Sequence, residues 1–157
     1  MKTNSKFHFT KKIIAASAAF ITCFNVTVFS QSDVSAVEKV LNVYNTAMQK
    51  LDTAGTAKLF ADSSLIVESG SVEGTYPHYE QHHIGPELSE FKSFIYSGYK
   101  VSMVIDVDYA FATEEFKYKI VAKQDGKVSE RNAVTTSVLK KINGKWKITM
   151  MHFSTRK

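Results

Sequence analysis

Residues 128–156 read VSERNAVTTSVLKKINGKWKITMMHFSTR, and this stretch decides the fold of the chain. Its centre is Asn143-Gly144, a dipeptide that favours the tight turn of a β-hairpin. The sequence therefore predicts two long antiparallel strands, 128–141 and 145–154. Alternation with a period of two places these side chains on one face of each strand: Ala133, Thr135, Ser137 and Leu139, then Trp146, Ile148, Met150, His152 and Ser154.

Two further strands are predicted immediately upstream. Apolar and polar residues alternate from Val101 to Phe111 and again from Phe116 to Val121. The turn at 124–127 contains Asp125-Gly126, a second hairpin signal. The C-terminal half is thus predicted to be a four-stranded antiparallel meander.

The segment before the meander has helical spacing. Apolar residues recur every three or four positions from Val34 to Leu51, which predicts a core-facing helix of about five turns. Short helices are predicted at 56–60 and 76–83, with a strand around 65–67 between them. A third helix is predicted from Pro86 to about Tyr96, burying Leu88, Phe91 and Ile95. Helices followed by strands indicate an α+β domain.

The order and spacing of several pieces resemble the nuclear transport factor 2-like superfamily, which includes SnoaL-like and ketosteroid-isomerase-like proteins. The pieces are VYNTA (43–47), LFAD (59–62), TSVLKK (136–141), GKWKI (144–148) and HFS (152–154). The resemblance implies a cystatin-like cone, in which a curved, mixed, mainly antiparallel sheet wraps around the N-terminal helices. It also implies an apolar pocket at the open end and a homodimer through the sheet. The superfamily contains enzymes and binding proteins, so the fold alone does not fix the function.

One departure from that family concerns the first strand. Ketosteroid-isomerase-like members carry their general base there, in a Val-Glu-Asp run, whereas this chain has Val67-Glu68-Ser69. Ser69 then takes the position of the base, and Glu68 is expected to point to the other face. A serine without a partner cannot accept a proton near neutral pH, which argues against steroid isomerisation.

Residues 1–30 have the parts of a secretory signal. Four lysines precede an apolar stretch from Ile13 to Phe29, and Ser30 offers a small residue at a cleavage site. The stretch is short and polar for a spanning helix. We therefore expect a signal peptide at 1–30 and one exported domain at 31–157, periplasmic or secreted, with no membrane attachment after cleavage. Cleavage would also remove Cys23, the single cysteine.

The charge of the mature chain excludes one class of partner. The whole chain has 20 Lys and Arg against 15 Asp and Glu, but four of the lysines lie in residues 1–30. The remaining 16 basic residues leave a net charge of only +1. A nucleic-acid-binding domain needs a basic face in its folded part, so we expect no nucleic-acid partner.

Three of the five histidines lie in one stretch, TYPHYEQHHIGPE (75–87). His78 and His82 are four residues apart and would share a helix face, as two metal ligands do. Imidazole and carboxylate ligands suit zinc or copper. No cofactor is predicted outright, but a metal site remains one hypothesis, with these candidate ligands: His78, His82, His83, Glu87 and His152.

A second hypothesis places an apolar pocket inside the cone. Side chains of the expected inner face would line it, with His78 and His152 as convergent polar groups. His152 is in register with Trp146 and Met150 and is therefore expected to point inward. The candidate ligand-binding residues are His78, Tyr109, Tyr118, Trp146, Met150 and His152, with Phe111 and Phe116 on the same expected wall.

The sequence leaves several functions open. The preferred one is non-catalytic binding of a small, apolar molecule in the cone. The alternatives are a SnoaL-like isomerase, cyclase or hydratase with His78 or His152 as acid and base, a metal-binding protein, and an interaction module that dimerises through its sheet.

Overall fold

The computed structural model describes residues 31–156. The signal peptide predicted at 1–30 lies outside the described residues. The elements are α1 (Gln31–Gln49), η1 (Thr56–Leu59), β1 (Phe60–Glu68), β2 (Ser71–Gly74), α2 (Tyr76–Tyr79), η2 (Glu80–Ile84), α3 (Gly85–Ser89), β3 (Phe91–Asp106), β4 (Tyr109–Ala122), β5 (Val128–Ile142) and β6 (Lys145–Arg156). Within this range, no helix is long and apolar enough to cross a membrane.

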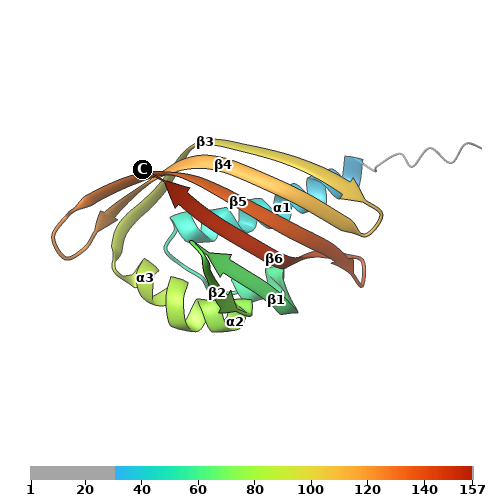
Figure 1. Cartoon of the computed structure of the whole chain (residues 1–157), viewed down its shortest axis with the longest axis horizontal. Coiled ribbons are helices and arrows are strands. Elements are labelled where there is room, and N and C mark those ends of the chain that lie inside the picture. Colours follow the sequence, from blue (N-terminus) through green and yellow to red (C-terminus); the bar gives the residue numbers. More distant parts are fainter. Residues whose placement is uncertain (1–30, 157) are drawn as a thin grey trace, which may run out of the picture.

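A single six-stranded sheet, in the order β2-β1-β6-β5-β4-β3, organises the fold. β1 runs parallel to β6, and the other neighbouring pairs are antiparallel. Figure 1 shows the sheet curving over the helices, so one of its faces is covered and the other is open. The predicted α+β class, with a curved, mixed, mainly antiparallel sheet, is confirmed.

The core lies between α1 and the covered face of the sheet. Val37, Leu41 and Met48 of α1 are buried, as the helical spacing predicted. The rings of Phe60 and Tyr76 stack with their centroids 3.7 Å apart and their planes 4° apart. Burying one such side chain stabilises the fold by roughly 1.5–3 kcal/mol. This packing fixes the start of β1 and of α2 against the first helix.

The helix predicted from Pro86 to Tyr96 is wrong beyond its first turn. Leu88 is buried as expected, but α3 ends at Ser89 and β3 begins at Phe91. Ile95 is 55% exposed on the open face of the sheet. Aromatic and β-branched residues here favour a strand, and pairing with the far half of β4 overrides their helical spacing.

The inner face predicted across residues 101–111 is wrong after Asp106. A two-residue turn at Val107 and Asp108 separates β3 from β4, and Val107 has a φ of 52°. The turn shifts the alternation by one residue, so Ala110 is buried inside. Tyr109 and Phe111 lie on the open face, 41% and 50% exposed.

A β-bulge in β6 has a similar effect. Leu139 pairs with Ile148 but Val138 pairs with Met150, which leaves Thr149 as an extra residue. The Thr149 hydroxyl donates to the Val138 carbonyl at 3.0 Å. Beyond the bulge Met151 is buried and Met150 is 38% exposed. The expectation that Met150 and His152 point inward is therefore wrong, since both lie on the open face.

Candidate functional site

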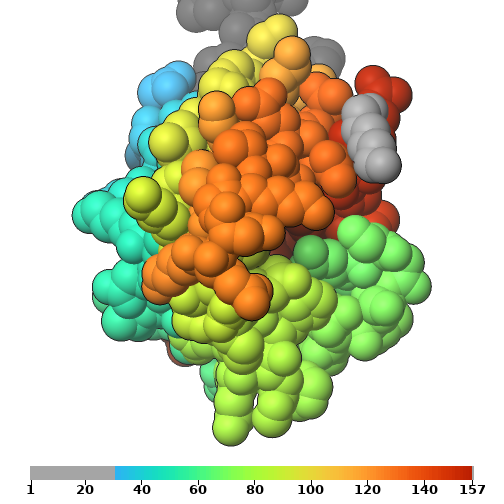
Figure 2. All heavy atoms as spheres, turned by 90° about the vertical axis from the view of Figure 1, so that its left-hand side faces the viewer, coloured from blue at the N-terminus to red at the C-terminus, as the bar shows by residue number. Residues whose placement is uncertain are grey.

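A cavity of about 200 Å³ lies under the sheet, between α1 and the helical segment from α2 to α3. Figure 2 looks at the end of the molecule where β5 and this helical segment approach each other, with a hollow between them and β6 at its bottom. The aromatic lining comes from α1 (Tyr44), α2 (Tyr79), β3 (Phe91, Phe94, Tyr96), β4 (Tyr118) and β6 (Phe153). The cavity is therefore formed by elements from both ends of the chain.

Neighbouring rings of this lining stand nearly perpendicular to one another. Phe94 makes edge contacts with Phe91 at 5.9 Å, with Tyr96 at 5.0 Å and with Tyr118 at 5.4 Å between centroids. Edge-to-face pairs of this kind stabilise packing by roughly 0.5–1.5 kcal/mol beyond the buried area. The wall around Phe94 is thus held in place by its own contacts.

Glu68, at the end of β1, is the main polar group of the cavity. The Tyr79 hydroxyl donates a hydrogen bond of 2.5 Å to its Oε2. Burial raises the pKa of Glu68 above its usual range, and the hydrogen bond from Tyr79 and the nearby His83 oppose this shift. Burial also raises the pKa of Tyr79 far above its usual range, so this hydroxyl keeps its proton.

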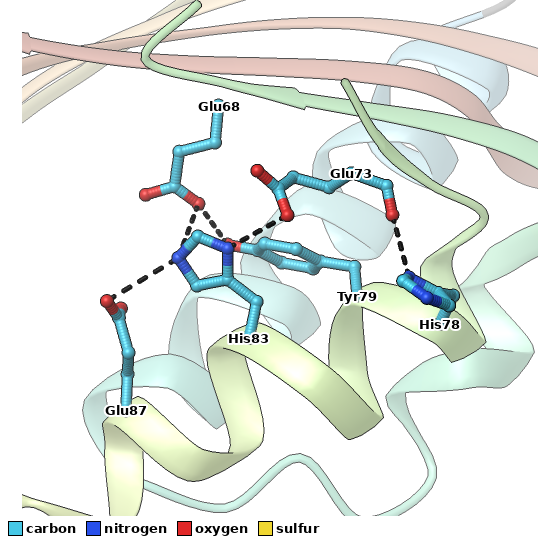
Figure 3. A network of polar contacts seen from close by, with 6 residues as sticks. All are labelled: Glu68, Glu73, His78, Tyr79, His83 and Glu87. Carbon is cyan, nitrogen blue, oxygen red and sulfur yellow. Dashed lines mark hydrogen bonds and ion pairs between the residues drawn. The ribbon is translucent and has the colours of Figure 1, made fainter. Parts of the chain in front are cut away.

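His83 lies beside this pair, among three carboxylates (Figure 3). Its Nδ1 is 3.0 Å from Glu73, while its Nε2 is 3.5 Å from Glu87 and 3.9 Å from Glu68. Burial disfavours the charged imidazolium, but the hydrogen bond to Glu73 and the charges of Glu68 and Glu87 outweigh it and raise the pKa of His83. His83 therefore carries positive charge to a higher pH than an isolated histidine.

A π-helical turn follows Tyr79 and contains His83. The segment η2 (Glu80–Ile84) is π-helical, and the Gly85 amide donates to the Glu80 carbonyl five residues earlier. A Cβ on residue 85 would lie 2.5 Å from that carbonyl oxygen, so only glycine fits without a shift. The ring of His83 lies 5.2 Å from that of Tyr79, and both side chains reach Glu68 from below. Single π-turns are frequent at functional sites.

A second carboxylate, Glu114 of β4, lies deeper in the interior and is 2% exposed. Its Oε1 accepts hydrogen bonds from Asn45 Nδ2 at 2.6 Å and from the Tyr99 hydroxyl at 2.7 Å. Burial raises the pKa of Glu114, and the two hydrogen bonds oppose this shift. Asn45 also lines the cavity, so this carboxylate lies directly behind its wall.

The ligand-binding residues predicted from the sequence are spread over the molecule. Tyr118 lines the cavity. Trp146 is buried at another end of the sheet, where its Nε1 donates to Asp33 at 2.9 Å. Tyr109, Met150 and His152 lie on the open face of the sheet, for the reasons given above.

The predicted metal ligands are likewise not gathered. His78 is exposed, its Nδ1 is 3.0 Å from the Glu73 carbonyl, and its ring lies 4.6 Å from that of His82. His83 contacts Glu87, but His152 lies on the far face of the sheet. Among residues 31–156, no group of three or more His, Cys, Asp or Glu side chains has the arrangement of a metal site.

Sequence reasoning missed Glu68 and Tyr79. It placed Glu68 on the other face, whereas Glu68 shares the inner face with the fully buried Ile66, and Ser69 begins the turn with a φ of 48°. The register of β1 shifts against both β2 and β6. Simple alternation along the sequence therefore does not show to which face Glu68 points. The one available signal was the spacing of Tyr79 and His83, which puts both on one helix face.

Comparison with known proteins supports this fold assignment. A family model described as SnoaL-like domain matches residues 37–156. No curated protein that was searched matches the chain. Among solved structures, a nuclear transport factor 2 (NTF2-like) superfamily protein from Salmonella enterica subsp. enterica serovar Typhimurium str. LT2 is similar, with 17% identity, 80% of this chain and 94% of that chain covered, and a TM-score of 0.69.

Two further solved structures share the fold. Hexachlorocyclohexane dehydrochlorinase LinA-type3 from Novosphingobium barchaimii LL02 has 13% identity, with 80% of this chain and 88% of that chain covered and a TM-score of 0.69. A protein of unknown function with a cystatin-like fold from Nostoc punctiforme PCC 73102 has 17% identity, with 81% and 93% covered and a TM-score of 0.61. With the family model spanning residues 37–156, the chain belongs to the SnoaL-like domain family of the nuclear transport factor 2-like superfamily.

Proposed function

We propose that this protein binds a small, largely apolar molecule in the cavity under the sheet, with a polar group of the ligand against Glu68 and Tyr79. One observation carries the proposal, namely an aromatic cavity of about 200 Å³ with a hydrogen-bonded carboxylate in its wall. An apolar cavity of about 150 Å³ is large enough to hold benzene. The expected ligand is therefore a molecule of about one ring.

Filling the cavity tests this proposal. Ile120→Phe adds a ring to a side chain that lines the cavity, and Val121→Phe adds the same ring at the next position, which does not line it. Overpacking costs roughly 1–3 kcal/mol, which a folded domain can tolerate. Titration with one-ring compounds, followed by NMR, should show binding to the wild type and to Val121→Phe but not to Ile120→Phe. Equal binding by all three proteins would contradict the proposal.

A second candidate function is proton transfer on the bound molecule, as in an isomerase or a dehydratase. Glu68 favours it, because a carboxylate with a raised pKa is a stronger base than an ordinary one. The structural neighbour named a dehydrochlorinase removes hydrogen chloride from its substrate, a reaction that also requires loss of a proton. Here Glu68 would accept the proton. The Tyr79 hydroxyl would hold the Glu68 carboxylate in place, and His83 would balance the charge of that carboxylate. His78 and His152, the candidates from the sequence, lie away from the cavity.

Glu68→Gln separates binding from chemistry. The amide keeps an oxygen for the Tyr79 hydroxyl but cannot take a proton. Loss of turnover by about 10²-fold or more with ligand affinity retained is expected for an essential general base. Unchanged turnover in the variant would remove Glu68 from that role.

The leader pattern of residues 1–30 supports export, so the ligand would be met outside the cytoplasm. The intact mass of protein purified from a bacterial host tests this, since cleavage after Ser30 removes a defined segment. A full-length mass in the periplasmic or secreted fraction would contradict cleavage.

A further inference from the structure

The charges around the cavity do not follow those of the chain as a whole. The mature sequence has nearly equal numbers of basic and acidic residues, 16 and 15. Yet Glu68 and Glu87 line the cavity, and among the described residues no lysine, arginine or histidine lines it. A ligand inside therefore meets two carboxylates in the wall, whereas His83, the cation that partly balances them, does not line the cavity.

His83 only partly balances these carboxylates. It lies within 3.9 Å of Glu68, Glu73 and Glu87, so one imidazolium is shared by three acids. With all four groups ionised, the cluster keeps a net charge of −2. The mouth of the cavity beside Glu87 is thus electronegative even when His83 is charged.

Glu114 is a further carboxylate, and it lies behind the part of the wall that Asn45 forms. Its hydrogen-bond partners Asn45 and Tyr99 are both neutral, so they stabilise this carboxylate without cancelling its charge. Its 2% exposure keeps water from screening it. Glu114, where ionised, therefore adds to the negative charge around the cavity.

The aromatic lining suits the same kind of guest. Seven aromatic residues line the cavity, and the rings around Phe94 stand at 76–82° to one another, so a guest meets ring faces as well as edges. Ring faces attract cations, by roughly 0.5–2 kcal/mol for each contact. Carboxylates and aromatic ring faces both bind organic ammonium ions.

We propose that the cavity selects a small organic cation, a molecule of about one ring that bears a protonated amine, with the ammonium group on the cavity side of Glu68 and Glu87 and the apolar part against Phe94. The inference rests on the proposed binding function and names its ligand class. A neutral ligand of the same size would lose the charge interactions, and an anion would be repelled.

Three compounds of one size and different charge test the proposal at pH 7, namely benzylamine, benzyl alcohol and benzoate. Each is titrated into the purified protein by isothermal calorimetry or NMR. Benzylamine should bind about tenfold more tightly than benzyl alcohol, a difference of about 1.4 kcal/mol. Benzoate should bind more weakly than either.

Two variants remove the charges separately. Glu68→Gln keeps the acceptor for Tyr79, and Glu87→Gln changes a side chain that is about half exposed, so the second variant keeps the fold even where the first is perturbed. Each should reduce the advantage of benzylamine over benzyl alcohol by about threefold or more, because one ion pair with the ammonium group is lost. Glu130→Gln, at an exposed ion pair with Lys119, is the matched control and should change nothing.

The outcomes distinguish the two proposals. Equal affinity for benzylamine and benzyl alcohol overturns the cation preference and leaves the binding function standing. A benzylamine preference that survives both Glu→Gln changes also overturns it, because the assigned carboxylates then contribute nothing. Binding of none of the three compounds at millimolar concentration contradicts the proposed one-ring ligand itself.

Discussion

At the residue scale, the partly buried Glu68 and the buried Glu114 carry most of the unusual chemistry of this protein. Glu68 is held by a tyrosine hydroxyl, and Glu114 by an amide and a second tyrosine hydroxyl. Burial raises the pKa of both. A buried carboxylate whose hydrogen-bond donors are all neutral, as at Glu114, reduces the stability of the fold, and groups of this kind are concentrated at functional sites.

Glu114 makes stability depend on pH in a defined direction. Its folded-state pKa is raised above 4.5, so the native state binds the proton more tightly than the unfolded chain does. The contribution of Glu114 to the free energy of unfolding is therefore greatest below about pH 4.5 and falls as the pH rises through its folded-state pKa. Glu114→Gln keeps the acceptor oxygen and should remove this fall, as urea unfolding between pH 4 and 7 would show.

Glu114→Leu is the contrasting change at the same site. It leaves the buried Asn45 amide without an acceptor, at a cost of roughly 1–3 kcal/mol, whereas the partly exposed Tyr99 hydroxyl can bond water instead. A leucine variant as stable as the glutamine variant would contradict the assigned hydrogen bonds.

Tyr79→Phe tests the second carboxylate. Removing the hydroxyl takes away a hydrogen bond that lowers the pKa of Glu68, so this pKa should rise further in the variant. A hydrogen bond to a charged group contributes roughly 1.5–3 kcal/mol, and stability at pH 7 should fall by about that amount. Carboxyl NMR titration and urea unfolding measure the two effects. Tyr109→Phe, on the open face, is the control and should be nearly neutral.

At the element scale, the π-turn η2 determines what faces the cavity. Tyr79 directly before this turn and His83 within it approach Glu68 together, while His78 and His82 remain outside. The geometry of the turn depends on the close approach of Gly85 to the Glu80 carbonyl.

Gly85→Ala should disturb this turn. The new methyl group would meet the Glu80 carbonyl oxygen at 2.5 Å, and backbone contacts of this kind cannot relax by rotating a side chain. The free energy of unfolding should fall by roughly 1–3 kcal/mol, and the pKa of His83 should move toward its ordinary value as its carboxylate contacts loosen. Histidine NMR titration measures the second effect. Gln81→Ala, at an exposed position in the same turn, should leave both quantities unchanged.

At the scale of the whole molecule, the open face of the sheet remains uncovered in the monomer (Figure 1). One apolar row crosses five strands on this face, each member paired directly with the next: Val104, Phe111, Val138, Met150 and Leu65. At about 4.8 Å between strands the row is about 20 Å long. A row of this length fits the centre of an interface that buries about 800 Å² on each partner.

We therefore expect a homodimer that packs through this face. Phe111→Lys should convert it to a monomer in analytical ultracentrifugation at micromolar concentration, because the lysine ammonium would be buried in the interface without a partner. Stability of the monomer should change by no more than about 0.5 kcal/mol, since Phe111 is half exposed. Val128→Lys, equally exposed but outside the row, should leave the dimer intact. A wild-type protein that sediments as a monomer would contradict the expectation.

Much of the fold was determined by the sequence itself. The spacing of Val37, Leu41 and Met48 specifies a one-sided helix, and Asp125-Gly126 and Asn143-Gly144 specify two hairpins. These signals are local, because helical spacing and turn conformation depend on residues a few positions apart. They were enough to predict the α+β class.

Only the tertiary structure decided which side chains face the cavity. Strand alternation is local, but one extra residue or one short turn reverses it, and the turn at Val107 and the bulge at Thr149 both do so. Neither has a glycine or proline to mark it in the sequence. The turn and the bulge depend on contacts that form only when the curved sheet closes around the helices. As a result His152 lies on the open face, while Glu68 faces the cavity.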